Sequence, residues 1–419
     1  MIGAQRGSLT LVKTGRDKLG PPREIDGQMV EEHTMAIIRK RSFVRRPHNE
    51  KDISSCGLIG FINRDGRRVG ARSIVEAVAN MHDRGNGLGG GFAAYGIYPD
   101  YPDAYALHLM YDDENAVAET EKLIRTKLTL VQAEPIPIRP GGKIKEHPEL
   151  RRYFVQVPES AEEDHDDYMV RVVMHVNVKI DGAFVVSSGR NMGAFKGVGY
   201  AEDLAEFFRL DEYEGYLWTA HNRFPTNTPG WWGGAHPFTI LDWSIVHNGE
   251  ISSYGINRRY LESFGYICTL MTDTEVVAYL FDLLVRRHGL TFEQAATVLA
   301  PPFWADIDRE GAQEARLLRQ IYASAALNGP FAFLFGYNGG LIGLNDRLKL
   351  RPLVVAERGD TVYMASEEAA IRVISPDLDH ISYPVAGQPV VARLRAGDES
   401  PALASSANSH LAGGASHVG

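Results

Sequence analysis

The chain has 419 residues, which is enough for one large domain or for two to three ordinary ones. Hydrophobic residues make up 44% and charged residues 23%, as in soluble globular proteins, and the net charge of −9 argues against nucleic acid or an anionic membrane as partner. No stretch approaches the roughly 18 apolar residues of a membrane span, and the first residues lack the apolar core of a secretory signal, so a cytoplasmic protein is expected.

Residues 1–55 are rich in charge and show no hydrophobic periodicity. Three interpretations stay open for this extension. It is a loosely packed arm, or a propeptide removed between Ser55 and Cys56, or translation begins at Met29 or Met35 and leaves a shorter leader.

Cysteine and histidine give no sign of a metal site. The chain has two cysteines, Cys56 and Cys268, and no C-x-x-C pair, so neither a disulfide framework nor a thiolate site is expected. Its 14 histidines show no H-E-x-x-H spacing. Cys268 is interpreted as structural.

Apolar runs and turn residues after Cys56 predict strands mixed with helices. Strands are expected at residues 57–62, 92–98, 105–111 and 183–188, and helices at residues 72–84, 115–128 and 201–208. Residues 132–150, rich in Pro, Gly and Lys, predict a loop, and residues 170–180 are ambiguous between helix and strand. The glycine-rich residues 85–91 lack a P-loop lysine and lead into a strand, which favours a close-packed turn over a phosphate site.

The next segment joins two strand-like runs, residues 216–220 and 238–246, through a loop rich in Pro, Gly and Asn. Polar residues follow each run: His221, Asn222 and Arg223 after the first, and His247, Asn248 and Gly249 after the second. Asn-Gly alone is typical of a turn, but this combination at two strand ends is typical of a substrate site. For the two loop tryptophans, Trp231 and Trp232, covering a pocket, meeting a partner and packing in the core all stay open.

The remaining residues predict helices at 256–264, 274–288, 290–300 and from 367, an amphipathic segment at 306–327, and strands at 331–337, 341–344, 353–356, 361–365 and 390–394. Thr272 or Asp273 is the expected N-cap of the helix that begins at residue 274. Residues 396–419 are rich in Ser, Ala and Gly and predict a disordered tail. Periodicity alone gives a mixed α/β or α+β chain.

Three motifs together resemble the class II glutamine amidotransferases: HNRFPTNTPGWWGGAHPF from His221, HNGEI from His247, and TDTE from Thr272. Within that family, the chain looks most like the glutaminase domain of glutamate synthase. CGLIGFINRDG, from Cys56, is similar to the mature start of those enzymes. The resemblance covers residues 56–395, taken as one amidotransferase domain, and implies an α+β fold, the four-layer αββα sandwich of N-terminal-nucleophile hydrolases.

The resemblance implies that Cys56 is the nucleophile and that its own α-amino group is the general base. The reference pKa of such an amine, ~7.7–8.0, suits a base near neutral pH. Cys56 is internal in this chain, so its nitrogen is an amide until the bond to Ser55 is cleaved. Related enzymes carry propeptides, which makes cleavage before Cys56 the expectation.

Four more residues receive roles from the resemblance. Asn248 and the Gly249 N–H are expected to form the oxyanion hole, Arg223 to bind the α-carboxylate of glutamine, and Asp273 to accept its α-ammonium group. The plainer alternatives are a structural arginine and a simple helix cap. Supporting positions around the loop are expected at His221, Thr226, Asn227, His236 and Glu250.

The resemblance is closest to stand-alone glutaminase subunits of archaeal-type glutamate synthases and N-methylglutamate synthases. It implies hydrolysis of L-glutamine to L-glutamate and ammonia by a cysteine thioester, with ammonia passed to a separate synthase subunit in a hetero-oligomer. The chain has no room for an additional barrel of ~250 residues, so FMN and iron–sulfur centres are expected on the partner and no cofactor on this chain. A non-catalytic scaffolding or regulatory subunit and a stand-alone amidase are the alternatives.

Overall fold

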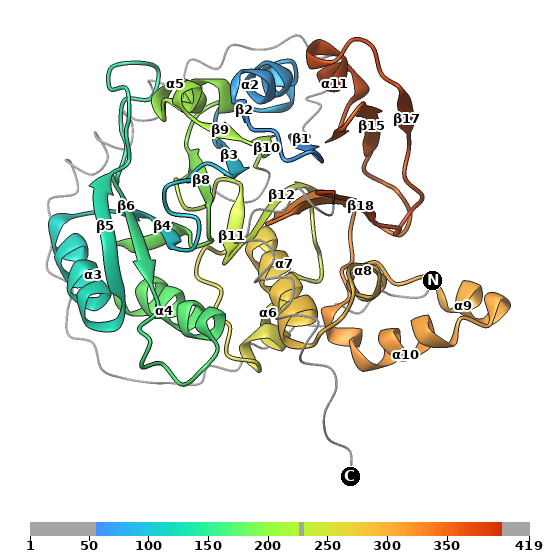
Figure 1. Cartoon of the computed structure of the whole chain (residues 1–419). Coiled ribbons are helices and arrows are strands. Elements are labelled where there is room, and N and C mark those ends of the chain that lie inside the picture. Colours follow the sequence, from blue (N-terminus) through green and yellow to red (C-terminus); the bar gives the residue numbers. More distant parts are fainter. Residues whose placement is uncertain (1–55, 226–229, 396–419) are drawn as a thin grey trace, which may run out of the picture. The chain divides into compact units, whose positions relative to one another are not determined.

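The computed structural model describes residues 56–225 and 230–395 (Figure 1). The expectations for residues 1–55 and 396–419 therefore lie outside the described residues.

A seven-stranded antiparallel sheet has the order β17-β15-β16-β1-β10-β3-β8. Its strands are β1 (Gly57–Asn63), β3 (Gly90–Tyr95), β8 (Met192–Gly197), β10 (Leu217–Asn222), β15 (Val354–Arg358), β16 (Thr361–Ala365) and β17 (His380–Ser382). The central strand β1 runs antiparallel to β10, with Gly57 opposite Asn222. This register brings the residue before β1, Cys56, to the end of the sheet where β10 finishes.

A second antiparallel sheet has the order β11-β12-β13-β14-β18. Its strands are β11 (Phe238–Ile240), β12 (Trp243–Gly249), β13 (Phe331–Tyr337), β14 (Gly340–Asn345) and β18 (Val390–Arg393). The expected single strand at residues 238–246 is a tight hairpin instead, because the chain reverses at Leu241, whose φ is +50°.

The two sheets pack face to face and helices cover both outer faces, so the expected four-layer αββα arrangement is confirmed. The layer between the sheets is apolar and includes Leu58, Tyr95, Val246 and Leu334. Helices α2 (Arg72–Ala79), α5 (Ala201–Phe207) and α11 (Glu368–Ile374) pack on the seven-stranded sheet, and α7 (Asp273–Phe281) packs on β11 and β12, with α6 (Tyr254–Glu262) beside it. Burying an apolar face against another element is what stabilises such layers.

The chain between β3 and β8 forms a separate four-stranded sheet, which the sequence analysis did not predict. It consists of β5 (Thr129–Pro135), β6 (Glu149–Gln156), β4 (Tyr105–Tyr111) and β7 (Ala183–Ser187), in that order, with α3 (Glu114–Lys127) and α4 (His165–Lys179). The prediction of a loop over residues 132–150 is wrong at both ends, because residues 132–135 belong to β5 and residues 149–150 belong to β6. The ambiguous residues 170–180 are helical, because their apolar side chains form one buried stripe of α4.

The remaining elements are short. They are β2 (Val69–Gly70), β9 (Glu214–Gly215), α8 (Phe292–Leu299), α9 (Trp304–Glu310), α10 (Gln313–Ile321), the π-helical turn η3 (Asp282–Arg287) that continues α7, and the 3-10 turns η1 (His82–Arg84), η2 (Leu210–Glu212) and η4 (Ala323–Ala325). The amphipathic segment expected at 306–327 is divided at Gly311, whose φ of +63° ends α9. In the part of the chain that the structure describes, no helix is long and apolar enough to cross a membrane.

Candidate active site

A cavity of about 190 Å³ opens where the two sheets and α7 meet. It is lined by Cys56, Arg223, Phe224, Pro225, His236, His247, Gly249, Glu250, Ile251, Tyr254, Met271, Thr272 and Asp273. Sites for drug-sized ligands measure roughly 300–1,000 Å³, so this cavity suits a metabolite of only a few heavy atoms.

Cys56 lies just before β1, with its thiol directed at the first residues after β10. The Phe224 N–H donates to its Sγ at 3.3 Å, and Arg84 Nε donates to its carbonyl oxygen at 3.1 Å. Arg84 is in turn paired with Glu367. Burial raises the pKa of the Cys56 thiol, although the Phe224 N–H and the Arg223 charge act in the opposite direction. The resting thiol is therefore protonated at neutral pH, and a reaction at sulfur needs a base.

Arg223 follows β10 and is buried, with 5% of its surface exposed. Its backbone N–H donates to the Gly89 carbonyl at 2.9 Å, and a Cβ on Gly89 would lie 3.0 Å from Arg223 Cδ. The glycine-rich residues 85–91 are thus the close-packed turn that the sequence predicts. Burial lowers the pKa of Arg223, while the nearby Cys56 and Asp273 raise it.

Asp273 is the first residue of α7, and its carboxylate is held from three sides. Ile251 N–H donates to Oδ2 at 2.9 Å, the Thr274 hydroxyl donates to Oδ1 at 3.2 Å, and His247 Nδ1 lies 3.7 Å from Oδ1. Burial opposes ionisation, but these three contacts keep the pKa of Asp273 below its ordinary value. The N-cap is Thr272, whose hydroxyl accepts from the Glu275 N–H at 3.3 Å. The Asp273 carboxylate is therefore available to the cavity.

Gly249 ends β12 at the cavity, in a conformation that needs glycine. Its φ is +150°, and a Cβ there would lie 2.0 Å from the Pro330 carbonyl oxygen. Asn248 is buried but is not among the described residues that line the cavity. Because side chains alternate along a strand, Asn248 shares the face of Val246, which packs between the sheets.

Three buried imidazoles lie together at the cavity: His236 and His247 line it, and His221 contacts both of them. His221 Nε2 donates to the His247 carbonyl at 2.8 Å, and the rings of His221 and His236 stack at 4.0 Å. His236 Nε2 and His247 Nδ1 lie 2.9 and 3.1 Å from the Thr274 hydroxyl. That hydroxyl has one proton, which Asp273 accepts, so both imidazoles must donate to it. Burial lowers the pKa of His221 to about 3 and that of His236 well below its ordinary value.

The sequence interpretation named His221 and His236 but missed His247 and Thr274 as contacts of Asp273. The sequence does carry a signal for them, since both flank expected site residues in the HNGEI and TDTE motifs. Among the other supporting positions, Glu250 lines the cavity and is exposed. Thr226 and Asn227 lie outside the described residues.

Two further loops near the cavity are fixed by buried charged residues. Lys196 Nζ donates to the Gly233 carbonyl at 3.0 Å, and Glu275 accepts from the N–H groups of Thr269 and Leu270, each at 2.9 Å. Burial lowers the pKa of Lys196 to about 7 and raises that of Glu275 to about 7.

The two tryptophans, Trp231 and Trp232, line no part of the Cys56 cavity. Trp231 packs edge-on against Phe184, with ring centroids 5.5 Å apart, and Trp232 packs against Phe207 at 5.9 Å. Of the three open interpretations, these contacts favour packing. Cys268 is buried, at 4% exposure.

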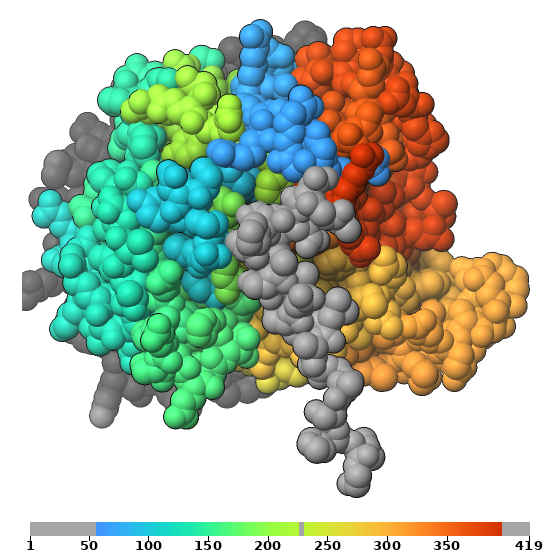
Figure 2. Space-filling model, viewed as in Figure 1, coloured from blue at the N-terminus to red at the C-terminus, as the bar shows by residue number. Residues whose placement is uncertain are grey.

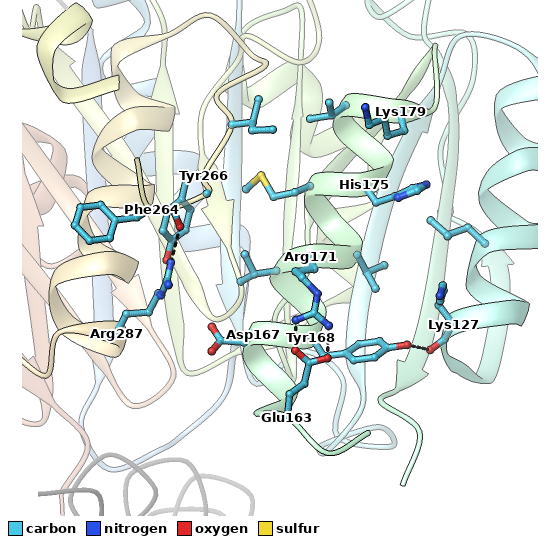
Figure 3. A pocket seen from close by; sticks show the side chains of 17 residues that line it. Lys127, Glu163, Asp167, Tyr168, Arg171, His175, Lys179, Phe264, Tyr266 and Arg287 are labelled. Atoms are coloured by element: carbon cyan, nitrogen blue, oxygen red, sulfur yellow. Dashed lines mark hydrogen bonds and ion pairs between the residues drawn. The ribbon is translucent and has the colours of Figure 1, made fainter. Parts of the chain in front are cut away.

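A larger hollow of about 670 Å³ lies over α4 (Figure 3). Figure 3 shows two pairs among its polar groups: Arg171 meets Glu163, and the Arg287 guanidinium donates to the Phe264 carbonyl at 2.9 Å. Neither Cys56 nor any other expected site residue lines it. Within residues 56–225 and 230–395, no group of three His, Cys, Asp or Glu side chains could hold a metal ion.

Comparison with known proteins places this chain in a family. A family model described as "Glutamine amidotransferases class-II" matches residues 113–265, a range that includes Arg223, Asn248 and Gly249. The "Uncharacterized protein" of Archaeoglobus fulgidus is 51% identical over 355 residues, covering 83% of this chain and 94% of that protein. The "Putative glutamine amidotransferase" of Methanothermobacter thermautotrophicus is 26% identical, covering 76% of this chain and 93% of that one.

Among solved structures, the glutamine phosphoribosylpyrophosphate amidotransferase of B. subtilis is similar at 16% identity and a TM-score of 0.41. The match covers 82% of this chain and half of that structure. The chain belongs to the class II glutamine amidotransferases, and it is an enzyme of that type.

Proposed function

We propose that this chain is a glutaminase subunit that hydrolyses L-glutamine to L-glutamate and ammonia through a thioester on Cys56. The observation that carries the proposal is the shared cavity. Cys56, Arg223, Gly249 and Asp273 come from four distant segments and line one space suited to an amino acid. Such a convergence of a nucleophile, a cation, an anion and a backbone donor fits amide hydrolysis of an α-amino acid.

Arg223 and Asp273 orient the substrate. The Arg223 guanidinium binds the α-carboxylate, and Asp273, ionised because its pKa is low, accepts the α-ammonium group. Opposite charges on two sides of the cavity select a zwitterionic amino acid and direct its side-chain amide towards Cys56 Sγ.

The reaction then proceeds in two halves. A base takes the Cys56 proton, and sulfur attacks the amide carbon of glutamine. The Gly249 N–H, which lines the cavity, stabilises the resulting oxyanion, and the protonated base gives its proton to the departing nitrogen, which leaves as ammonia. Water, deprotonated by the same base, attacks the thioester and releases glutamate. The Phe224 N–H, 3.3 Å from Sγ, supports the thiolate.

The Cys56 α-amine serves as the base once the bond to Ser55 is broken. We expect the chain that begins at Cys56 to release glutamate from glutamine and the chain that retains Ser55 to release none. Because the base acts in its neutral form, kcat/KM should rise with pH through the amine pKa, ~7.7–8.0 in reference peptides.

Intact mass and glutamate release, measured on the same preparations, test this expectation. Equal activity of the two chains, or a flat pH profile between pH 6 and 9, would contradict the role of the amine. An inactive chain that begins at Cys56 would contradict the glutaminase function itself and favour a scaffolding subunit.

A second test concerns the Thr274 hydroxyl, which joins Asp273 to His236 and His247. Thr274→Val keeps the shape of the side chain but removes this hydroxyl, so two imidazoles and a carboxylate each lose a partner. A lost hydrogen bond to a charged group costs ~1.5–3 kcal/mol, so we expect KM for glutamine to rise at least about 10-fold with little change in kcat. Thr274→Ser should restore KM in the same steady-state assay, and a Ser variant as poor as Val would contradict the assignment.

We further propose that ammonia passes to a separate synthase subunit of the glutamate synthase or N-methylglutamate synthase type, which would carry FMN and iron–sulfur centres. The resemblance of the motifs supports this assignment. The size of the relatives supports it too: the matches span 94% and 93% of the two archaeal proteins, so neither has an added domain of synthase size.

A further inference from the structure

Exposed apolar side chains gather on one surface near the cavity. Of the 14 large hydrophobic side chains that are exposed among the described residues, five belong to three segments that meet there. We call this surface the aromatic–arginine patch; it consists of Phe303, Trp304, Arg347, Leu348, Leu350 and Tyr383. In Figure 2 the orange segment with α9 and α10 forms a lobe below the red segment with β15 to β17, and the patch draws residues from both.

Cation–aromatic contacts join the three segments. The Arg347 guanidinium lies 4.9 Å from the Phe303 ring centroid, and Lys349 Nζ lies 5.9 Å from that of Tyr383. Arg319, on α10, lies 4.2 Å from the Trp304 centroid. Exposed aromatic and arginine side chains are the residues that dominate binding energy at protein interfaces.

Three cations gather at the patch although the chain carries a net charge of −9: Arg347 belongs to it, and Arg319 and Lys349 lie against its aromatic rings. Arg319, Arg347 and Lys349 have no carboxylate within ion-pair distance among the described residues. Nearby acids pair with other cations: Asp306 with Arg309 at 2.8 Å, Asp308 with Arg316, and Glu368, which accepts from the Tyr383 hydroxyl, with Arg372 at 2.6 Å. A surface of opposite charge would therefore complement the patch.

Two hydrogen bonds lead from the patch to the segment that lines the cavity. Arg347 Nη2 donates to Asn328 Oδ1 at 2.9 Å, and the Asn328 carbonyl accepts from the Ser252 N–H at 2.8 Å. Ser252 follows Ile251, which lines the cavity. Arg351, in the same loop as Arg347, is also close enough to Cys56 for its positive charge to lower the pKa of that thiol, against the larger effect of burial.

We propose that the aromatic–arginine patch docks the subunit that receives ammonia, a different protein whose contact surface places carboxylates around apolar side chains. This inference rests on the proposed glutaminase function, because ammonia must leave a cavity that hydrogen bonds through Asn328 and Ser252 connect to the patch. A second copy of this chain fits less well. A two-fold interface sets one patch against itself, which would oppose three cations to three cations.

The experiment uses the full tagged chain, isolated from cells of its source organism at physiological salt. The probe is the flavin absorbance of the co-purified synthase subunit per chain. Arg347→Glu and Leu348→Asp should each lower it at least about 10-fold. The matched control is Val131→Asp, which places the same charge at an exposed position on β5 and should retain the flavin of the wild type.

Glutamate release from glutamine is measured on the same samples, because both patch variants should hydrolyse glutamine as the wild type does. Flavin retained by the patch variants, or absent from the wild-type sample, would overturn the docking proposal. Light scattering that showed a wild-type dimer broken by Arg347→Glu would overturn it in favour of self-association. A wild type that keeps the flavin but releases no glutamate would instead overturn the glutaminase function.

Discussion

Replacing Cys56 by Ala is expected to lower glutamate release from glutamine by about 10⁴-fold or more, the scale on which removal of a catalytic nucleophile acts. Without sulfur no thioester forms, and the other cavity residues can only orient glutamine for attack by water. The fold should persist, because Cys56 precedes β1 and is only partly buried. Coupled-enzyme detection of glutamate over hours would measure the residual rate.

Cys268→Ala is the matched control for this variant. It removes the other free thiol, which is buried away from the cavity, and should leave the rate near that of the wild type. A Cys56→Ala chain that keeps more than about a hundredth of wild-type activity would contradict the thioester pathway. Calorimetry would measure glutamine binding to the Cys56→Ala variant. Unchanged binding together with lost activity would show that Cys56 acts in the chemical step and not in substrate affinity.

The grouping of the cavity residues could be predicted because three of them stand at the ends of regular elements. Arg223 follows β10, Gly249 ends β12 and Asp273 begins α7. Strand and helix ends are readable from turn residues and caps, and antiparallel pairing of β1 with β10 then brings Cys56 alongside. What could not be predicted is the tilt of α7 on β12, which decides that Thr274 and His247 meet.

The four-stranded sheet escaped prediction for a different reason. Its edge strand β5 (Thr129–Pro135) buries neither face, so its sequence lacks the alternation that marks a half-buried strand. Its neighbour β6 carries Arg152, an unlikely core residue by composition, whose charge is compensated by Glu134 on β5. A pairing between side chains on two strands is invisible until the strands are adjacent.

Replacing Arg223 by Lys is expected to lower kcat/KM for glutamine by about 100-fold, chiefly through KM. A lysine retains the charge but cannot form the planar two-point contact with a carboxylate. Hydrogen bonds to charged groups contribute ~1.5–3 kcal/mol, and the buried position of Arg223 leaves little water to replace the lost contact. Steady-state kinetics with glutamine as sole substrate would measure the change.

A substrate analogue without the α-carboxylate completes a double-mutant cycle. If Arg223 acts on that carboxylate, replacing glutamine by the analogue should lower kcat/KM of the wild type by about as much as Arg223→Lys lowers kcat/KM for glutamine. The same change of substrate should lower kcat/KM of the variant only a little. Additive losses would mean that Arg223 supports the cavity wall instead, through its contact with the 85–91 turn at Gly89. The same cycle run with Asp273→Asn and an analogue without the α-amino group asks whether Asp273 recognises the substrate or only organises the start of α7, since Thr272 already caps that helix.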